Sequence, residues 1–329
     1  MDTLKAPQNV SANKQSSALD RHAPIIVAGS ANMDLVFHAE RLPERGETLL
    51  GGAFATFAGG KGANQAVAAA RLGASVAMLG CVGGDEFGAQ LRNGLQHEQI
   101  DTAHLHTIDD MSSGIAVITV AADGANTIVV SPGANAALTP GHVDAAAADI
   151  AAAGMLICQL EVPLDTVRHA IAVAVRLGTP VLLNPAPAQP LPDALYEQLS
   201  LLVLNETEAA MLADMPVDSP ASAREAAMRL RAKGVATVIV TLGAQGVWYS
   251  TSGEEGHLPA ARVDAIDTTA AGDTFVGGFA AERVRGANIR DAIDFGQRAA
   301  ALSVTRQGAQ ASIPTQAEVR ALPASATAI

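Results

Sequence analysis

The residues with the clearest chemical potential lie in segment 58–66, AGGKGANQA, which leads into a helical stretch. Its glycines let the backbone approach a ligand closely, and the helix N-terminus directs free N–H groups at polar or anionic oxygen atoms. Lys61 precedes Gly62 instead of Ser or Thr, so the segment is not a Walker A phosphate loop. Lys61 and Asn64 favour a hydroxyl-rich ligand, although a plain tight turn before a helix would use the same glycines.

A second cluster, residues 267–275 with the sequence DTTAAGDTF, places a carboxylate at the start of a helix. Asp273 falls in the first helical turn. The three preceding residues, Ala270, Ala271 and Gly272, offer backbone N–H groups that a helix leaves unpaired. The segment therefore pairs a base with a site for an anion. The alternative is an Asp that only caps the helix, which would not need the small residues before it.

A third set of polar residues follows the first predicted strand, in the segment GSANMD over residues 29–34. Open α/β sheets bind ligands at this position, so Asn32 and Asp34 could bind neighbouring hydroxyl groups. The same residue types are also common in ordinary turns after a strand. This strand–turn–helix unit lacks a GxGxxG fingerprint, which argues against a nicotinamide-dependent enzyme.

The elements that must position these segments alternate along the chain from residue 24. Short β-rich runs occur at 25–29, 75–80, 155–160, 181–184, 201–205 and 237–243, and residues 262–266 are also strand-like. Helical stretches occur at 61–72, 85–98, 141–152, 163–177, 220–233 and 272–285. The alternation predicts a doubly wound α/β fold with a mostly parallel sheet and helices on both faces.

Two stretches break this alternation, residues 35–57 and about 104–130, where short alternating runs stand between turn residues and no crossover helix follows. We expect antiparallel strands that form a small separate sheet against the main domain, and a lid is one use of such a sheet. Residues 1–23 are polar and without period, which predicts a disordered tail. One α/β domain would then cover residues 24–329.

Composition excludes several classes of function. The chain has 33 Asp and Glu against 21 Lys and Arg, a formal charge of −12 that repels nucleic acids and anionic membranes. No stretch approaches the ~20 apolar residues of a membrane span, and no signal segment is visible. Cys81 and Cys158 lie in apolar runs, which predicts buried thiols in a reducing compartment, and no zinc-binding spacing occurs. We expect a cytoplasmic protein that binds neither nucleic acid nor a membrane.

The segments GGKGANQA and DTTAAGDTF resemble the two signatures of the ribokinase (PfkB-type) family of carbohydrate kinases. The resemblance covers residues 24–320 and extends to GSANMD, LNPAPA (183–188), NETE (205–208), TLGAQG (241–246) and VTRQGAQAS (304–312). Within the family, these motifs favour the members that phosphorylate ribose over the fructokinase and adenosine kinase relatives. The fold implied is ribokinase-like, with the small antiparallel sheet as its lid.

The resemblance implies ATP-dependent phosphorylation of the 5-hydroxyl group of D-ribose. Asp273 would be the catalytic base, and the amides of Ala270, Ala271 and Gly272 would hold the charge that develops on the transferred group. The resemblance also implies a set of residues that bind the sugar: Asn32, Asp34, Gly60, Lys61, Asn64, Glu161 and Asp273. On its own, Glu161 could equally be a solvated residue after an apolar strand.

For the nucleotide, the resemblance implies contacts from Asn205, Thr241, Leu242, Gly243, Ala244, Gln245, Gly246, Gly272, Asp273 and Gln297. Glu208 would organise Mg²⁺ through water, which suits an ion that dehydrates reluctantly. The residues alone leave two alternatives open, a helix capping box at 205–208 and a hairpin turn at 241–246. Gln297 stands where relatives often have His or Asn, so the contact with adenine also stays open.

An activating monovalent cation, usually potassium, is also implied by the resemblance. Its oxygen ligands, largely backbone carbonyls, would come from Asp267, Thr269, Ser303, Arg306, Gly308 and Ser312. Ser303 replaces a common Ala, which a backbone ligand tolerates. Relatives pair through their lids, so a homodimer is expected as well.

Two alternatives to a ribose kinase remain open at this point. One keeps the family but changes the sugar to deoxyribose or another pentose or ketose. The other is a non-catalytic sugar or nucleotide sensor on the same fold, because a fold alone does not fix a function. An intact Asp273 and its anion site weigh against a sensor.

Overall fold

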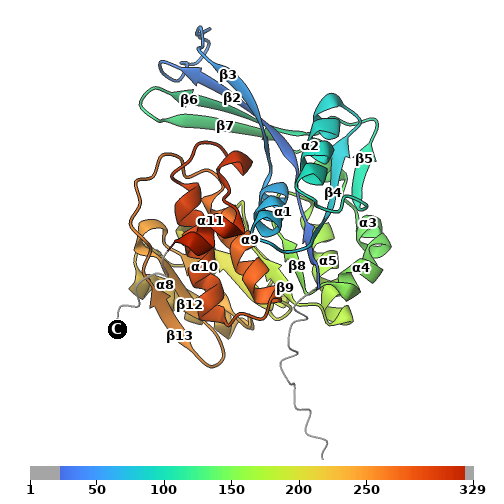
Figure 1. Ribbon diagram of the computed structural model, residues 1–329, viewed down its shortest axis with the longest axis vertical. Helices are drawn as coiled ribbons and strands as arrows, with labels where there is room; N and C mark the ends of the chain where they lie inside the picture. Colours follow the sequence, from blue (N-terminus) through green and yellow to red (C-terminus); the bar gives the residue numbers. More distant parts are fainter. Residues whose placement is uncertain (1–22, 323–329) are drawn as a thin grey trace, which may run out of the picture.

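The computed structural model of the protein describes residues 23–322, which build two β-sheets (Figure 1). The larger sheet has the strand order β13-β12-β11-β10-β9-β8-β1-β4-β5. These strands are β1 (Ile25–Ala28), β4 (Val76–Gly83), β5 (Leu105–Ile108), β8 (Met155–Cys158), β9 (Val181–Leu183), β10 (Leu201–Leu204), β11 (Val238–Thr241), β12 (Val247–Ser250) and β13 (Glu255–Leu258). Neighbours from β11 to β5 are parallel and the other pairs antiparallel, so the mostly parallel sheet is confirmed.

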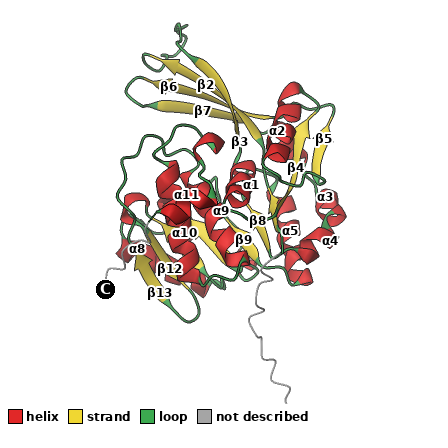
Figure 2. Ribbon diagram, viewed as in Figure 1, coloured by secondary structure: helices red, strands yellow, loops and turns green. Residues whose placement is uncertain are grey.

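Helices cover both faces of this sheet, as predicted for a doubly wound fold (Figure 2). One face carries α1 (Lys61–Arg71), α2 (Glu86–His97), α9 (Ala271–Val284) and α10 (Ile289–Ser303). The other carries α3 (Pro140–Ala145), α4 (Ala147–Ala152), α5 (Leu164–Leu177), α7 (Glu206–Ala213) and α8 (Pro220–Ala232). A hydrophobic core lies between the sheet and the helices on each face. In β1, Ile25 and Val27 belong to the core on the side of α1 and α9, and Ile26 and Ala28 belong to the core on the side of α5 and α8. Because both faces of β1 are buried, it reads as a continuous apolar run.

Two short helices complete the body, α6 (Asp193–Tyr196) and α11 (Gln316–Ala321). Val319 of α11 is buried against Phe295 of α10. Cys81 and Cys158 are free and buried, as predicted, and burial raises the pKa of their thiols to about 11 and about 12. The tail predicted over residues 1–23 lies outside the described residues, except for Ala23.

The smaller sheet projects from one end of the α/β body (Figure 1). Its strands, in spatial order, are β3 (Phe54–Gly59), β2 (Asn32–Ala39), β6 (Gly114–Ala121) and β7 (Asn126–Ser131). Both outer pairs are antiparallel, as predicted, whereas the central pair β2–β6 is parallel, with Asn32 opposite Gly114. The pair is parallel because both strands start at the α/β body, where Asn32 and Gly114 are paired, and both run away from it.

Two strand predictions differ from the structure. Residues 105–108, expected in the small sheet, form β5 and pair with β4 in the large sheet, because α2 is the crossover helix between these two strands. Residues 262–266 are not a strand but a loop, in which Ile266 is 64% exposed. The N–H groups of Ile266 and Asp267 donate to the Val304 carbonyl at 2.7 and 3.1 Å. A short strand-like pattern alone therefore did not identify a paired strand.

Candidate active site

The start of α1 is held in place by the ends of two neighbouring strands of the large sheet. Glu161, beyond β8, accepts a hydrogen bond from the Lys61 N–H at 2.9 Å and one from the Ser30 hydroxyl at 2.5 Å. Gly60 precedes the helix with φ of +86°, and a Cβ there would lie 2.7 Å from the Asn32 amide nitrogen. The glycine is therefore required by both its backbone conformation and the close approach of segment 29–34.

Asp273, in the first turn of α9, is buried between side chains of α1. Its Oδ2 accepts a hydrogen bond from Asn64 Nδ2 at 3.1 Å, and its Oδ1 accepts one from Gln65 Nε2 at 2.9 Å. Burial raises the pKa of Asp273, while Lys61 and the two amides oppose that rise. The two helix N-termini thus bring together the signatures that the sequence places more than 200 residues apart.

Three carboxylates act on the Lys61 ammonium. Burial lowers the pKa of Lys61, but the charges of Asp273, Glu161 and Glu208 outweigh it and raise the pKa on balance. Burial, followed by the charges of Glu161 and Asp273, raises the pKa of Asp34 to about 7. The Asp34 carboxylate lies against Gly59, where a Cβ would be 2.2 Å from Oδ2. Because Lys61 interacts with three acids and Asp34 interacts with two of them, acidic groups outnumber the single ammonium, and the site attracts cations and hydroxyl donors.

The raised pKa of Asp34 predicts a pH-dependent stability. Its pKa rises from 3.8 to about 7 on folding, so the folded chain binds more protons than the unfolded chain between these values. The free energy of unfolding therefore falls as pH rises from about 4 to about 7. The Asp34→Asn variant lacks this fall, and above about pH 8 we expect it to exceed the parent protein in stability by up to about 4 kcal/mol. Urea unfolding measures the difference, and equal pH dependence in both proteins would contradict it.

A cavity of about 200 Å³ connects the acid at the start of α9 to the end of β10. Its lining includes Lys61, Asn184, Asn205, Glu208, Thr241, Ala270, Ala271, Gly272 and Asp273. Four of the predicted nucleotide residues are in this set, namely Asn205, Thr241, Gly272 and Asp273, and Gln297 is not. Gln297 is buried elsewhere, with its Nε2 donating to the Leu258 carbonyl at 3.3 Å.

The predicted anion site is built on a left-handed residue, Ala270, with φ of +57°. The Ala270 carbonyl accepts hydrogen bonds from both the N–H and the hydroxyl of Thr274, each at 2.8 Å. The Ala271 N–H donates to the Thr268 carbonyl at 3.2 Å. Within residues 23–322, no backbone acceptor meets the N–H groups of Ala270 and Gly272. These two amides, more than the third, are available to an anion.

Asn205 and Glu208 form a capping box at the start of α7, the alternative that the sequence left open. Glu208 N–H donates to Asn205 Oδ1 at 2.9 Å, and Asn205 N–H donates to Glu208 Oε2 at 3.0 Å. Both residues also line the cavity, so capping does not remove them from the site. Burial raises the pKa of Glu208.

The predicted nucleotide segment 241–246 is the turn between β11 and β12, as its hairpin alternative required. It contains a 3₁₀ turn, Gly243–Gln245, and the Leu242 N–H donates to the Gly246 carbonyl at 2.8 Å. Leu242 is buried in the core, so only its backbone could contact a ligand. Thr241 lines the cavity; the loop tip, with Ala244 and Gln245, lies beyond that lining.

The two loops predicted to hold a monovalent cation lie side by side. Asp267 Oδ1 accepts a hydrogen bond from the Thr269 N–H, and its Oδ2 accepts one from the Gly308 N–H, both at 2.9 Å. These bonds hold the pKa of Asp267 below its usual value despite burial. The carboxylate thus ties the loops together.

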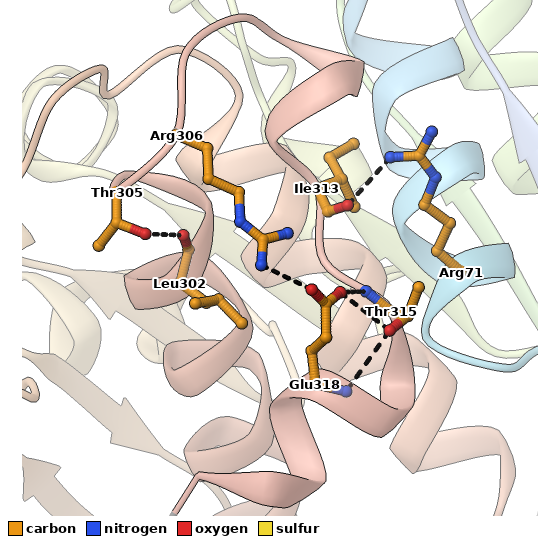
Figure 3. A network of polar contacts seen from close by, with 7 residues as sticks. All are labelled: Arg71, Leu302, Thr305, Arg306, Ile313, Thr315 and Glu318. Atoms are coloured by element: carbon orange, nitrogen blue, oxygen red, sulfur yellow. Dashed lines mark hydrogen bonds and ion pairs between the residues drawn. The ribbon is translucent and has the colours of Figure 1, made fainter.

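Other predicted cation ligands have their side chains engaged within the protein. The Arg306 guanidinium donates to Glu318 of α11 at 2.7 Å (Figure 3). The hydroxyls of Ser303 and Ser312 donate to the carbonyls of Ala300 and Ala309, at 2.9 and 2.8 Å. Any cation ligand from Arg306 would therefore be a backbone carbonyl.

Sequence reasoning missed four buried polar residues of the site. Asn135, in the 3₁₀ helix Gly133–Ala137, donates from Nδ2 to Asn32 Oδ1 at 2.7 Å and accepts at Oδ1 from the Ala31 N–H at 2.9 Å. The other three are Gln65, Gln159 and Asn184, which lie behind Asp273. Gln65 and Asn184 fall inside the quoted motifs GGKGANQA and LNPAPA, which was the available signal.

The mostly parallel α/β fold carries a buried acid and a lysine at the starts of two helices, an arrangement that suits phosphoryl transfer. The chain belongs to the pfkB family of carbohydrate kinases, because the model of that family matches residues 23–316. It is therefore an ATP-dependent sugar kinase. Within residues 23–322, no helix is both long and apolar enough to cross a membrane.

Individual relatives cover almost the whole chain. A ribokinase from Haemophilus influenzae is 46% identical over 294 residues, which cover 89% of this chain and 96% of the relative. A deoxyribokinase from Salmonella typhi is 42% identical over 292 residues, covering 88% and 95%. The structure of Arabidopsis thaliana ribokinase complexed with ribose and ATP has a TM-score of 0.84 and 31% identity, covering 91% of this chain and 97% of that one.

Proposed function

We propose that the chain is a ribokinase, which transfers the γ-phosphoryl group of ATP to the 5-hydroxyl of D-ribose and releases ribose 5-phosphate and ADP. The observation that carries the proposal is the placement of buried Asp273, at the start of α9, beside Lys61 and two free amides. The ribokinase names of several relatives, at 40 to 46% identity, support the choice of sugar.

Asp273 is the proposed base that accepts the proton of the 5-hydroxyl group. Burial raises its pKa, which makes the carboxylate a stronger base than one in water. The amides of Ala270 and Gly272 hold the negative charge that develops on the transferred phosphoryl group, with Ala271 as a weaker third donor. The remaining catalytic contribution is positioning of the two substrates.

The sugar is proposed to lie between the start of α1 and the base of the small sheet. Asn32, Asp34, Lys61, Asn64 and Glu161 supply the donors and acceptors there, and Gly60 allows close approach. A polyol matches this polar lining better than an apolar ligand would. Because deoxyribokinases are 42% identical to the chain, 2-deoxyribose is the main competing substrate.

The proposed position of ATP follows the cavity from Gly272 and Asp273 to Asn205 and the 241–246 turn, with Gln297 as a more distant candidate at adenine. The acids around Lys61 fit a bound Mg²⁺, because a phosphate chain would otherwise meet mostly negative charge. Glu208 would hold the ion through water. The ion neutralises charge on the phosphates when it is bound.

Potassium is proposed to bind between the loop of Asp267 and Thr269 and the loop that contains Ser303, Arg306, Gly308 and Ser312. Carbonyl oxygens suit a hard cation, and the site would stiffen the loop that leads to Ala270. Replacing potassium with tetramethylammonium at constant ionic strength should lower kcat severalfold, because the larger ion does not fit. Initial rates of ADP release measure this, and equal rates in both salts would remove the cation from the proposal.

The small sheet is proposed to close over ribose as a lid and to pair two chains into a homodimer. Its edge strand β7 exposes Ile128, Val129 and Val130 by 57, 69 and 50%, and exposed apolar edges are normally covered. We expect sedimentation at twice the chain mass, and a Val129→Lys variant should sediment as a monomer. A wild-type monomer would contradict the dimer.

A cytoplasmic location is proposed from the ATP requirement and the free thiols.

Phosphorus NMR of the product tests the proposed reaction directly. Incubation with D-ribose, ATP and Mg²⁺ in potassium buffer should give a single sugar monophosphate whose phosphorus couples to the two protons on C5. A phosphate on C1 or C3 would contradict the assignment of the 5-hydroxyl group to Asp273. A product from 2-deoxyribose but none from ribose would favour the deoxyribokinase alternative.

A further inference from the structure

Three buried amide side chains stand behind the proposed base, and the contacts assigned to ribose and ATP use none of them. Gln65 and Gln159 are fully buried, and Asn184 is 9% exposed. They come from α1 and from the ends of β8 and β9. Buried amides are destabilising unless their hydrogen bonds are made, so three together call for an explanation.

The orientation of each amide is fixed by groups that can only accept hydrogen bonds. The Val203 carbonyl accepts from Asn184 Nδ2 at 3.0 Å, which directs Asn184 Oδ1 toward Gln65. Gln65 Nε2 donates one hydrogen to that oxygen and the other to Asp273 Oδ1, both at 2.9 Å. Gln65 Oε1 is then left to accept from Gln159 Nε2, at 2.6 Å. Turning Gln65 over would place its oxygen against two acceptors, and turning Gln159 over would place its oxygen against Gln65 Oε1.

Among the described residues, Gln159 has an unpaired buried oxygen, which is destabilising, and the hydrogen bond that its Nε2 donates to Gln65 offsets this cost. Its Oε1 is buried and has no hydrogen-bond partner within residues 23–322, and a Cβ on Gly29 would lie 2.0 Å from it. An apolar side chain of similar size would avoid the unpaired oxygen. The amide is therefore accounted for by the hydrogen bond that it donates to Gln65.

We propose that Gln65 is a positioning residue for the base Asp273, held in a single orientation by Gln159. With Gln65 on Oδ1 and Asn64 on Oδ2, the carboxylate plane is fixed, and its charged form is stabilised against burial. Asn184 Nδ2 also reaches Glu208 Oε2 at 3.5 Å, so the base and the metal-facing acid share one framework. The inference rests on the proposed function of Asp273.

The test is the pH dependence of kcat for Gln65→Met and Gln65→Glu. Asp273 must be charged to accept a proton, so kcat falls as pH drops through its pKa. Loss of the Gln65 donor raises that pKa, and we expect the acid limb of Gln65→Met to move up by about one pH unit. Gln65→Glu adds a carboxylate beside the base and should move the limb further. The KM for ribose should change little.

Two further variants separate positioning from general damage to the fold. Val67→Ala also removes buried contacts from α1, but leaves the amides intact, and its acid limb should match the wild type. Gln159→Met acts only through the orientation of Gln65 and should give a smaller upward movement. An unmoved acid limb in both Gln65→Met and Gln159→Met, in protein that still binds ribose by calorimetry, would overturn the inference. A wild type without sugar-dependent turnover would instead overturn the proposed function.

Discussion

The Asp273→Asn variant is expected to lose a factor of roughly 10² or more in kcat. Asparagine keeps the size of the side chain and can still accept from Asn64 or Gln65, but it has no lone pair basic enough to take the hydroxyl proton. The dissociation constants for ribose and ATP should stay within about threefold, because the lost interaction belongs to the transition state. Steady-state kinetics and calorimetry measure the two quantities.

Asp291 provides the matched control for this variant. It is also an aspartate in the first turn of a helix, α10, but it is exposed, and among the described residues its carboxylate accepts a hydrogen bond only from its capping partner Asn288. Asp291→Asn should leave kcat unchanged. Similar losses in both variants would mean that Asp273 acts as a helix cap, the alternative that its sequence position left open.

The Gly60→Ala variant is expected to be strongly destabilised and to lose sugar binding. The added methyl group would need a left-handed backbone, with φ of +86°, and would lie 2.7 Å from the Asn32 backbone nitrogen. Strain and overlap together should lower the free energy of unfolding by about 2–4 kcal/mol. Because relief of the overlap moves Asn32 away from α1, affinity for ribose should fall as well. Urea unfolding and calorimetry check both effects.

Gly94, in the middle of α2, is the control for Gly60. No atom lies within 4 Å of its added Cβ, and its backbone is helical. Gly94→Ala should therefore raise the free energy of unfolding by about 0.5–1 kcal/mol through helix propensity, with unchanged ribose affinity. Destabilisation of the same size at both glycines would refute the close-approach argument.

Local patterns in the sequence were sufficient to predict which residues stand at the two helix starts of the candidate site. A glycine-rich turn before a helix placed Lys61 and Asn64, and small residues before an acid placed Asp273. The strands of the large sheet were readable because burial on both faces makes them apolar throughout. Where two physical roles used the same residues, the pattern could not separate them. Asn205 and Glu208 cap α7 and line the cavity at once.

Strand pairings and hydrogen bonds between residues far apart in the chain could not be predicted from the sequence. Residues 105–108 and 262–266 are both short strand-like runs of mixed polar and apolar residues, but only the first finds a partner strand. Gln159 stands at the end of an apolar strand and has no periodic signal, so its bond to Gln65, 94 residues away, emerges only on folding. The parallel pairing of β2 with β6 likewise depends on where two distant excursions leave the body.

Sugar-dependent release of ADP tests the central claim most directly. Purified protein with ATP and Mg²⁺ in potassium buffer is offered D-ribose, 2-deoxyribose, fructose or adenosine, and initial rates are fitted for kcat/KM. The account predicts the highest value for ribose. A higher value for another acceptor would contradict the ribose assignment, and an absence of turnover with every sugar, in protein that still binds ribose, would favour a sensor.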